Sequence, residues 1–219
     1  MNLHGLDAII FDFDGVLVES VNIKTQAFAA LYADHGEKIV AQVEDYHLRH
    51  GGESRFEKFR YFQTEFVGGA ALKDSEVADL ASRFSQLVID RVVSAPMVLG
   101  AQEFLDQCHN QFPLFIVSGT PKPELGEILE RRGLGKFFKD FRGSPGTKAE
   151  HVSELLRENA IAADRCVVIG DALADLEGAV SNDVKFLGRV AENDENRFPD
   201  EVTTFVDFHH LPESWRQES

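Results

Sequence analysis

Two aspartates stand two residues apart near the start of the chain. Asp12 and Asp14 directly follow an apolar run, Ala8–Phe11, that predicts a buried strand. A carboxylate at such a place binds a cation or takes part in chemistry, because burying an unpaired charge is unfavourable. Gly15 allows a sharp turn after the pair. Open parallel sheets bind ligands at the carboxyl ends of their strands, so this spacing predicts two acidic groups at a functional site.

A hydroxyl and an accessible backbone amide follow a second predicted strand. The apolar run Leu114–Val117 leads directly into Ser118, Gly119 and Thr120. Ser118 offers its hydroxyl, and Gly119 has no side chain to keep an oxyanion away from its N–H group. This segment therefore suits the binding of negatively charged oxygens.

Further carboxylates and one lysine complete the set. Asp171 and Asp175 follow the predicted strand Val167–Ile169, and Lys148 ends a loop rich in glycine and proline where a helix begins. Mg²⁺ takes one or two carboxylates together with the phosphate oxygens of a substrate. Phosphoryl transfer otherwise depends on positioning and charge neutralisation. These residue types therefore predict phosphoryl transfer assisted by Mg²⁺.

The elements that must position these groups alternate in type. Two more strands are predicted at Lys185–Leu187 and Thr203–Val206, and helical patterns cover Gly100–Gln111, Pro123–Arg132 and Ala149–Asn159. Strands that alternate with helices indicate a parallel sheet covered on both faces. We therefore predict an α/β fold with a doubly wound, Rossmann-like parallel-sheet core.

One stretch after the first strand has helical periodicity and no convincing strand. A helix start is visible at Asp74, and four aromatic residues before it share one helical face: Phe56, Phe59, Phe62 and Phe66. We predict an all-helical cap domain over residues 17–91, with residues 1–16 and 92–219 forming the core. A module inserted just after the strand that carries the aspartates suits a lid over the site.

The composition argues against several function classes. The chain has 37 acidic and 22 basic residues and a net charge of −15, which disfavours binding to nucleic acid or to an anionic membrane. No apolar run is long enough to span a bilayer, and no secretory signal is visible. The two cysteines, Cys108 and Cys166, lie far apart. We expect a cytoplasmic protein in a reducing compartment, and the sequence does not indicate its oligomeric state.

Four motifs in order carry a family resemblance. They are Asp-Phe-Asp-Gly-Val at 12–16, Val-Ser-Gly-Thr at 117–120, Lys148, and Gly-Asp-Ala-Leu-Ala-Asp at 170–175. Each motif alone is unspecific, but the ordered set on predicted strand ends is specific. The chain resembles the haloacid dehalogenase superfamily, near the phosphoglycolate phosphatases and β-phosphoglucomutases. The resemblance implies a Mg²⁺-dependent phosphatase that hydrolyses a small phosphomonoester, such as a sugar phosphate or a phosphoglycolate-like compound, through an aspartyl-phosphate.

The resemblance also implies catalytic roles. Asp12 would be the nucleophile, and Asp14 would be the general acid and then the general base. Ser118, with the Gly119 N–H and Thr120, would bind the phosphoryl oxygens of the substrate.

A second group of matched residues would neutralise negative charge or bind the metal ion. Lys148 would neutralise the nucleophile and the phosphoryl group. Mg²⁺ would be held by the side chains of Asp12 and Asp171 and by the backbone carbonyl of Asp14. Asp175 would support these ligands without binding the ion directly.

The cap offers two candidate substrate contacts. The segment Gly52-Glu-Ser-Arg55 is similar to a loop in β-phosphoglucomutase-like caps whose arginine reaches the substrate. The alternative is a helix start that Ser54 caps, with Arg55 solvated. Lys24 stands where the mutases carry a histidine, and it either binds a substrate anion or is solvated on a helix face.

The sequence leaves three functions open. A phosphatase acting on a small phosphorylated metabolite is favoured. A sugar-phosphate mutase is the first alternative, and the lysine at the mutase histidine position counts against it. An inactive scaffold that binds phosphorylated ligands is the second, and the presence of every matched acid and of Lys148 counts against that. His47 and His50 lack partners for a metal set, so we expect surface histidines.

Overall fold

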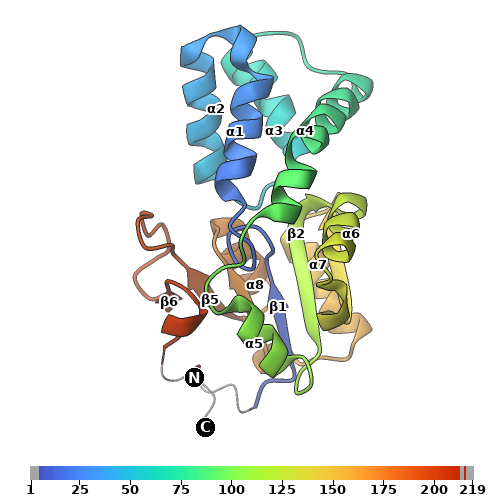
Figure 1. The fold of residues 1–219 in the computed structure, drawn as a ribbon, viewed down its shortest axis with the longest axis vertical. Helices are drawn as coiled ribbons and strands as arrows, with labels where there is room; N and C mark the ends of the chain where they lie inside the picture. The colour runs from blue at the N-terminus through green and yellow to red at the C-terminus, as the bar shows by residue number, and fades with distance from the viewer. Residues whose placement is uncertain (1–4, 213–214, 216–219) are drawn as a thin grey trace.

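The apolar run Ala8–Phe11 forms β1, the central strand of a parallel sheet (Figure 1). This structure is a computed structural model that describes residues 5–212 and residue 215. Six strands pair in the order β3-β2-β1-β4-β5-β6 within that part of the chain. The other five are β2 Leu114–Pro121, β3 Asp140–Ser144, β4 Cys166–Gly170, β5 Lys185–Arg189 and β6 Thr204–Phe205. The chain order reverses at β1, which makes the carboxyl end of this strand the expected place for a ligand.

Helices cover both faces of the sheet, as the alternation predicted. Successive residues of β1 point to opposite faces: Ile9 and Phe11 pack into one core cluster, and Ala8 and Ile10 into another. The first cluster includes Phe104 of α5, and the second includes residues of α7. The core helices are α5 Ala101–Cys108, α6 Lys122–Arg131, α7 Lys148–Glu158 and α8 Leu173–Val180.

Two features of the sheet differ from the prediction. Strand β3 was missed because Asp140–Ser144 has no apolar run; it lies at the edge of the sheet, and its first three residues are only partly buried. Strand β2 continues beyond Val117 as far as Pro121, and its pairing with β3 shifts register after Ser118. The polar residues Ser118 to Thr120 therefore belong to the irregular end of a strand.

The chain between β1 and α5 forms a helical cap, which Figure 1 shows at one end of the molecule. Its helices are α1 Val21–Leu31, α2 Glu37–Arg49, α3 Arg55–Tyr61 and α4 Asp74–Ser94, and a π-helix at Phe62–Val67 continues α3. Phe28 of α1 lies at the centre of the cap and contacts the rings of Phe59, Phe62 and Phe84. The predicted fold class is confirmed. The domain boundary at residue 91 stays a prediction, and helix α4 continues three residues past it to Ser94. No helix in the described ranges is long and apolar enough to cross a membrane.

A buried ion pair joins the cap to the core. The Arg55 guanidinium on α3 donates to both carboxylate oxygens of Glu124 on α6, at 2.6 and 2.8 Å. The Ser85 hydroxyl of α4 donates to the same carboxylate, and the Phe84 ring lies 4.4 Å below the guanidinium. Arg55 and Glu124 are only 4 and 6 % exposed. This pair therefore ties the cap down over the carboxyl ends of the strands.

We expect Arg55→Met to lower the free energy of unfolding by about 3–5 kcal/mol, because it leaves the Glu124 carboxylate buried without a partner. The double variant Arg55→Met/Glu124→Leu should recover most of this loss, since an apolar pair needs no hydration. Urea unfolding of the two single variants and the double variant measures the coupling.

The exposed pair Arg49–Asp45 on α2 is the control. Arg49→Met should change the free energy of unfolding by less than about 1 kcal/mol. A double variant as unstable as the sum of its single variants would contradict the coupling between Arg55 and Glu124.

Candidate active site

Asp12 and Asp14 follow β1 and have different hydrogen-bond and ion-pair partners. The Asp12 carboxylate accepts a hydrogen bond from the Phe13 N–H at 2.7 Å, and its other oxygen lies 2.9 Å from Nζ of Lys148. The Asp14 carboxylate accepts hydrogen bonds from the hydroxyls of Ser20, at 2.6 Å, and Thr120, at 2.9 Å. It also forms an ion pair with Lys24. The two acids thus have separate hydrogen-bond networks.

The start of α7 places Lys148 beside Asp12. Thr147 caps this helix: its hydroxyl accepts from the Glu150 N–H, and the Glu150 carboxylate accepts from the Thr147 N–H. Lys148, the first helical residue, then directs its Nζ to Asp12 and to Asp175, the latter at 2.5 Å. Burial alone would lower the pKa of Lys148, but these two carboxylates raise it above its ordinary value. Lys148 is therefore a fixed positive charge behind the nucleophile candidate.

Three carboxylates gather at the ends of β1 and β4. Ligand oxygens of Asp12, Asp171 and Asp175 lie within 4.8 Å of one another. Burial, together with repulsion from Asp12, raises the pKa of Asp175 to about 7, although Lys148 opposes this shift. Burial and the two neighbouring acids raise the pKa of Asp171 well above its ordinary value. Lys148 is paired with Asp12 and Asp175, whereas Asp171 forms no ion pair with a described residue. Three carboxylates thus share one positive charge, and the cluster fits a divalent cation.

Gly15 makes room for this cluster. Its φ of +77° suits glycine, and a Cβ atom at this position would lie 2.1 Å from a carboxylate oxygen of Asp171. The expected metal ligands Asp12 and Asp171 are thus brought together, with Asp175 beside them. The carboxylate of Asp14 lies with Lys24 instead, and the expectation for its backbone carbonyl stays a prediction.

The end of β2 lies under a loop of the cap. The Ser118 hydroxyl accepts a hydrogen bond from the Thr120 N–H at 3.1 Å, and both residues are 2 % exposed. A Cβ atom on Gly119 would lie 2.5 Å from the carbonyl oxygen of Gly52, and one on Gly52 would lie 2.8 Å from Nζ of Lys148. Only glycines allow the cap loop to lie so close to the core.

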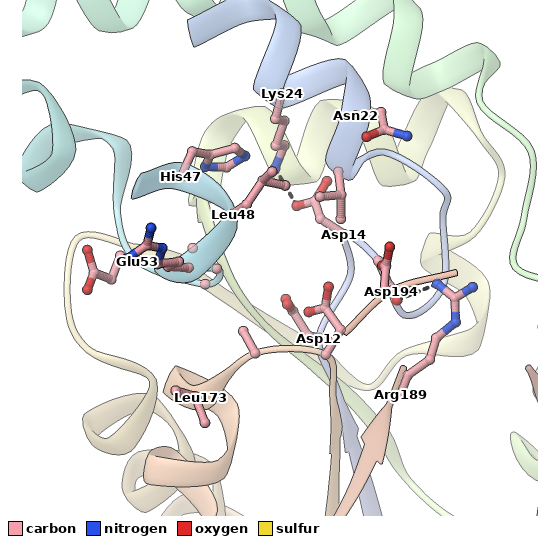
Figure 2. A pocket seen from close by; sticks show the side chains of 18 of the residues that line it. Asp12, Asp14, Asn22, Lys24, His47, Leu48, Glu53, Leu173, Arg189 and Asp194 are labelled. Carbon is pink, nitrogen blue, oxygen red and sulfur yellow. Dashed lines mark hydrogen bonds and ion pairs between the residues drawn. The ribbon is translucent and has the colours of Figure 1, made fainter. Parts of the chain in front are cut away.

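A cavity of about 460 Å³ lies between cap and core. Figure 2 shows Asp12 on the core side and Lys24 and His47 on the cap side. The core lines it with Asp12, Asp14, Ser118, Gly119, Thr120 and Asp171, and the cap lines it with Lys24, His47, Gly52, Glu53, Arg55 and Lys58. Lys148 and Asp175 stand behind this lining.

The cap candidates are not solvated. Ser54 does cap α3, since its hydroxyl accepts from the Phe56 N–H, but Arg55 is buried against Glu124. The Lys24 side chain is 11 % exposed and contacts Asp14 and the Thr120 hydroxyl. The alternative that these basic groups are solvated on helix faces is therefore wrong, while binding of substrate by either one stays a prediction.

Sequence reasoning missed two residues that line the cavity, His47 and Lys58. His47 is not at the surface: it is 9 % exposed, and burial, with the nearby charge of Lys58, lowers its pKa well below the ordinary value. His50 is half-buried and its ring stacks on Tyr46. Lys58 is 1 % exposed. A sequence signal for Lys58 existed, because it lies four residues before Phe62, which is the spacing of neighbours along one side of a helix.

Comparisons with known proteins agree with this geometry. A family model described as haloacid dehalogenase-like hydrolase matches residues 6–183. The chain is 25 % identical over 177 residues to a phosphoglycolate phosphatase of Synechococcus elongatus, covering 80 % of this chain and 79 % of that protein. It is 22 % identical over 221 residues to a 6-phosphogluconate phosphatase of Escherichia coli, covering 96 % and 95 %. A β-phosphoglucomutase structure from Clostridium difficile superposes with a TM-score of 0.76 at 16 % identity, covering 95 % and 94 %. The chain belongs to the haloacid dehalogenase-like hydrolases.

Proposed function

We propose that this hydrolase removes phosphate from a small phosphomonoester, with Asp12 as the nucleophile. The observation that carries this proposal is the separation of the two aspartates: Asp12 lies against the fixed charge of Lys148, and Asp14 lies in a network of its own. Related proteins named phosphoglycolate phosphatase and 6-phosphogluconate phosphatase support the same reaction class. The cavity volume suits a small metabolite.

The first half of the reaction would transfer the phosphoryl group to the protein. A carboxylate oxygen of Asp12 attacks phosphorus, the new O–P bond forms, and the bond to the leaving alcohol breaks. Asp14 gives a proton to the leaving oxygen. Lys148 and the N–H of Gly119 balance the charge on the phosphoryl oxygens.

The second half would release phosphate. Water attacks phosphorus, its proton passes to Asp14, and the carboxylate of Asp12 is restored. Burial would raise the pKa of Asp14, but Lys24, Ser20 and Thr120 together hold it below the ordinary value. Asp14 is therefore ionised in the closed site without substrate, so it would take up a proton as the substrate binds, before it gives that proton to the leaving oxygen. After that transfer Asp14 is again ionised, which is the form that accepts the proton of water.

The acid cluster would hold Mg²⁺ through Asp12 and Asp171, with the backbone carbonyl of Asp14 as a third ligand. Bound there, the ion would neutralise phosphoryl charge. Asp175 would stay with Lys148, at 2.5 Å, and keep that lysine oriented.

Asp12→Asn should lower kcat for phosphomonoester hydrolysis by at least about 10³-fold, since the amide has nearly the same shape but cannot form the acyl phosphate. Release of inorganic phosphate from a panel of phosphomonoesters with Mg²⁺ measures the loss. Asp79→Asn, at an exposed position of α4, is the control and should keep full activity. A folded Asp12→Asn protein with a tenth of the wild-type rate would refute the covalent route. A product that is a rearranged sugar phosphate, with no free phosphate, would identify a mutase.

Asp171→Asn should separate stability from metal binding. The metal-free variant should be at least as stable as the wild type, because the substitution removes a partly buried carboxylate that its neighbours repel. The wild type should gain about 2.7 kcal/mol at a Mg²⁺ concentration 100 times its dissociation constant, and the variant should lose most of that gain. Thermal unfolding with and without Mg²⁺ measures both effects, with Asp79→Asn as control. An equal gain in the wild type and the Asp171→Asn protein would rule out Asp171 as a ligand.

A further inference from the structure

Lys58 is a buried cation that lines the cavity, and no carboxylate in the described part of the chain forms an ion pair with it. Its side chain extends from α3 and is 1 % exposed. Among the described residues, no carboxylate oxygen forms an ion pair with its Nζ, and its hydrogen-bond partner is Nδ1 of His47 at 2.9 Å. The Phe28 ring lies 5.9 Å from the Nζ on another side. An ammonium group in such surroundings is unfavourable unless an anion accompanies it.

The other buried or partly buried cations of the cavity are already neutralised. Lys24 pairs with Asp14, Arg55 with Glu124, and Arg189 with Glu19. Arg197 is exposed and donates to a backbone carbonyl. Lys58 therefore differs from the buried basic groups around it, because its charge is free to meet a ligand.

His47 adds a second unused donor. A charged Lys58 can only donate, so Nδ1 of His47 accepts and the ring proton lies on Nε2. That Nε2 atom is buried and has no hydrogen-bond partner among the described residues. Burial lowers the pKa of Lys58 to about 7, although the charges of Glu53 and Asp171 oppose this shift without contacting the ammonium group. Among the described residues, His47 Nε2 thus has no acceptor, Lys58 has only a neutral one, and both side chains line one cavity.

We propose that Lys58 and His47 together bind a carboxylate at the end of the substrate remote from its phosphate. This inference rests on the proposed phosphatase function and narrows the substrate class to phosphomonoesters that carry a carboxylate. One cation and one neutral donor match a single negative charge. A second phosphate would bring two charges into a cavity that Glu53, Asp194 and Glu195 also line, where it would be repelled.

Two pairs of compounds of similar length test the proposal. One is 6-phosphogluconate against sorbitol 6-phosphate, and the other is phosphoglycolate against ethylene glycol monophosphate; the second member of each pair lacks the carboxylate. With Mg²⁺ present, the wild type should favour the carboxylated member of at least one pair by about tenfold or more in kcat/KM. Lys58→Met should remove this preference mainly through KM, and should leave kcat/KM for the member without the carboxylate within about threefold of the wild-type value.

Variants at the same two positions separate binding from structure. Lys58→Arg keeps a cation and should keep the preference, and His47→Phe should weaken it severalfold. Lys38→Met, at an exposed position of the cap, is the matched control and should change neither value. Lys58→Met should melt at a temperature no lower than the wild type, because it removes a buried charge without a partner.

The outcomes distinguish this inference from the proposed function. Hydrolysis of both members of each pair at equal rates by the wild type would overturn the carboxylate site and leave the phosphatase standing. Equal losses on both members in Lys58→Met, with a lower melting temperature, would show a structural lysine and overturn the inference as well. A wild type that hydrolyses none of the four compounds, nor p-nitrophenyl phosphate, would overturn the proposed function and this inference together.

Discussion

Crowding of like charges at the ends of β1 and β4 is the constraint on which the site depends. Oxygens of Asp12, Asp171 and Asp175 share a region 4.8 Å across, and carboxylates that close together cannot all stay ionised in a buried place without cations. Lys148 supplies one positive charge, and it contacts Asp12 and Asp175. Asp171 is the carboxylate of this cluster that Lys148 does not neutralise, and it lines the cavity. The fold therefore keeps a place for a cation where a phosphate would arrive.

The contact between cap and core depends on backbone shape as well as charge. Gly52 lies against Lys148 and Gly119, at distances that leave no room for a Cβ atom on either glycine. The buried pair of Arg55 and Glu124 then fixes the start of α3 on the core. Asp12, Ser118 and Thr120 are buried at this contact, and burial strengthens electrostatic interactions.

The sequence predicted the core better than the cap, for a physical reason. Buried strands read as apolar runs, and their ends carry the acids, so the residue pattern alone located β1, β4 and the cluster around Asp12. Strand β3 lies at an edge and is half-polar, so no apolar run marked it. The partners of Arg55 and Lys58 depend on how helices far apart in the chain pack together. Glu124 lies 69 residues from Arg55, and local periodicity carries no information about such a pair.

The position of Lys24 couples the cap to the chemistry of the core. This lysine lies on α1, the first helix after β1, and its charge is one of the causes that hold the pKa of Asp14 below the ordinary value against the effect of burial. A cap that moves away from the core would take Lys24 away from Asp14 and Thr120 and would open the acid to water. The ionisation of Asp14 therefore depends on the position of the cap relative to the core. Substrate that separates Lys24 from Asp14 while the cap stays closed leaves the acid buried without its cation. Burial then favours the protonated form, which is the form that the proposed proton transfer from Asp14 to the leaving oxygen requires.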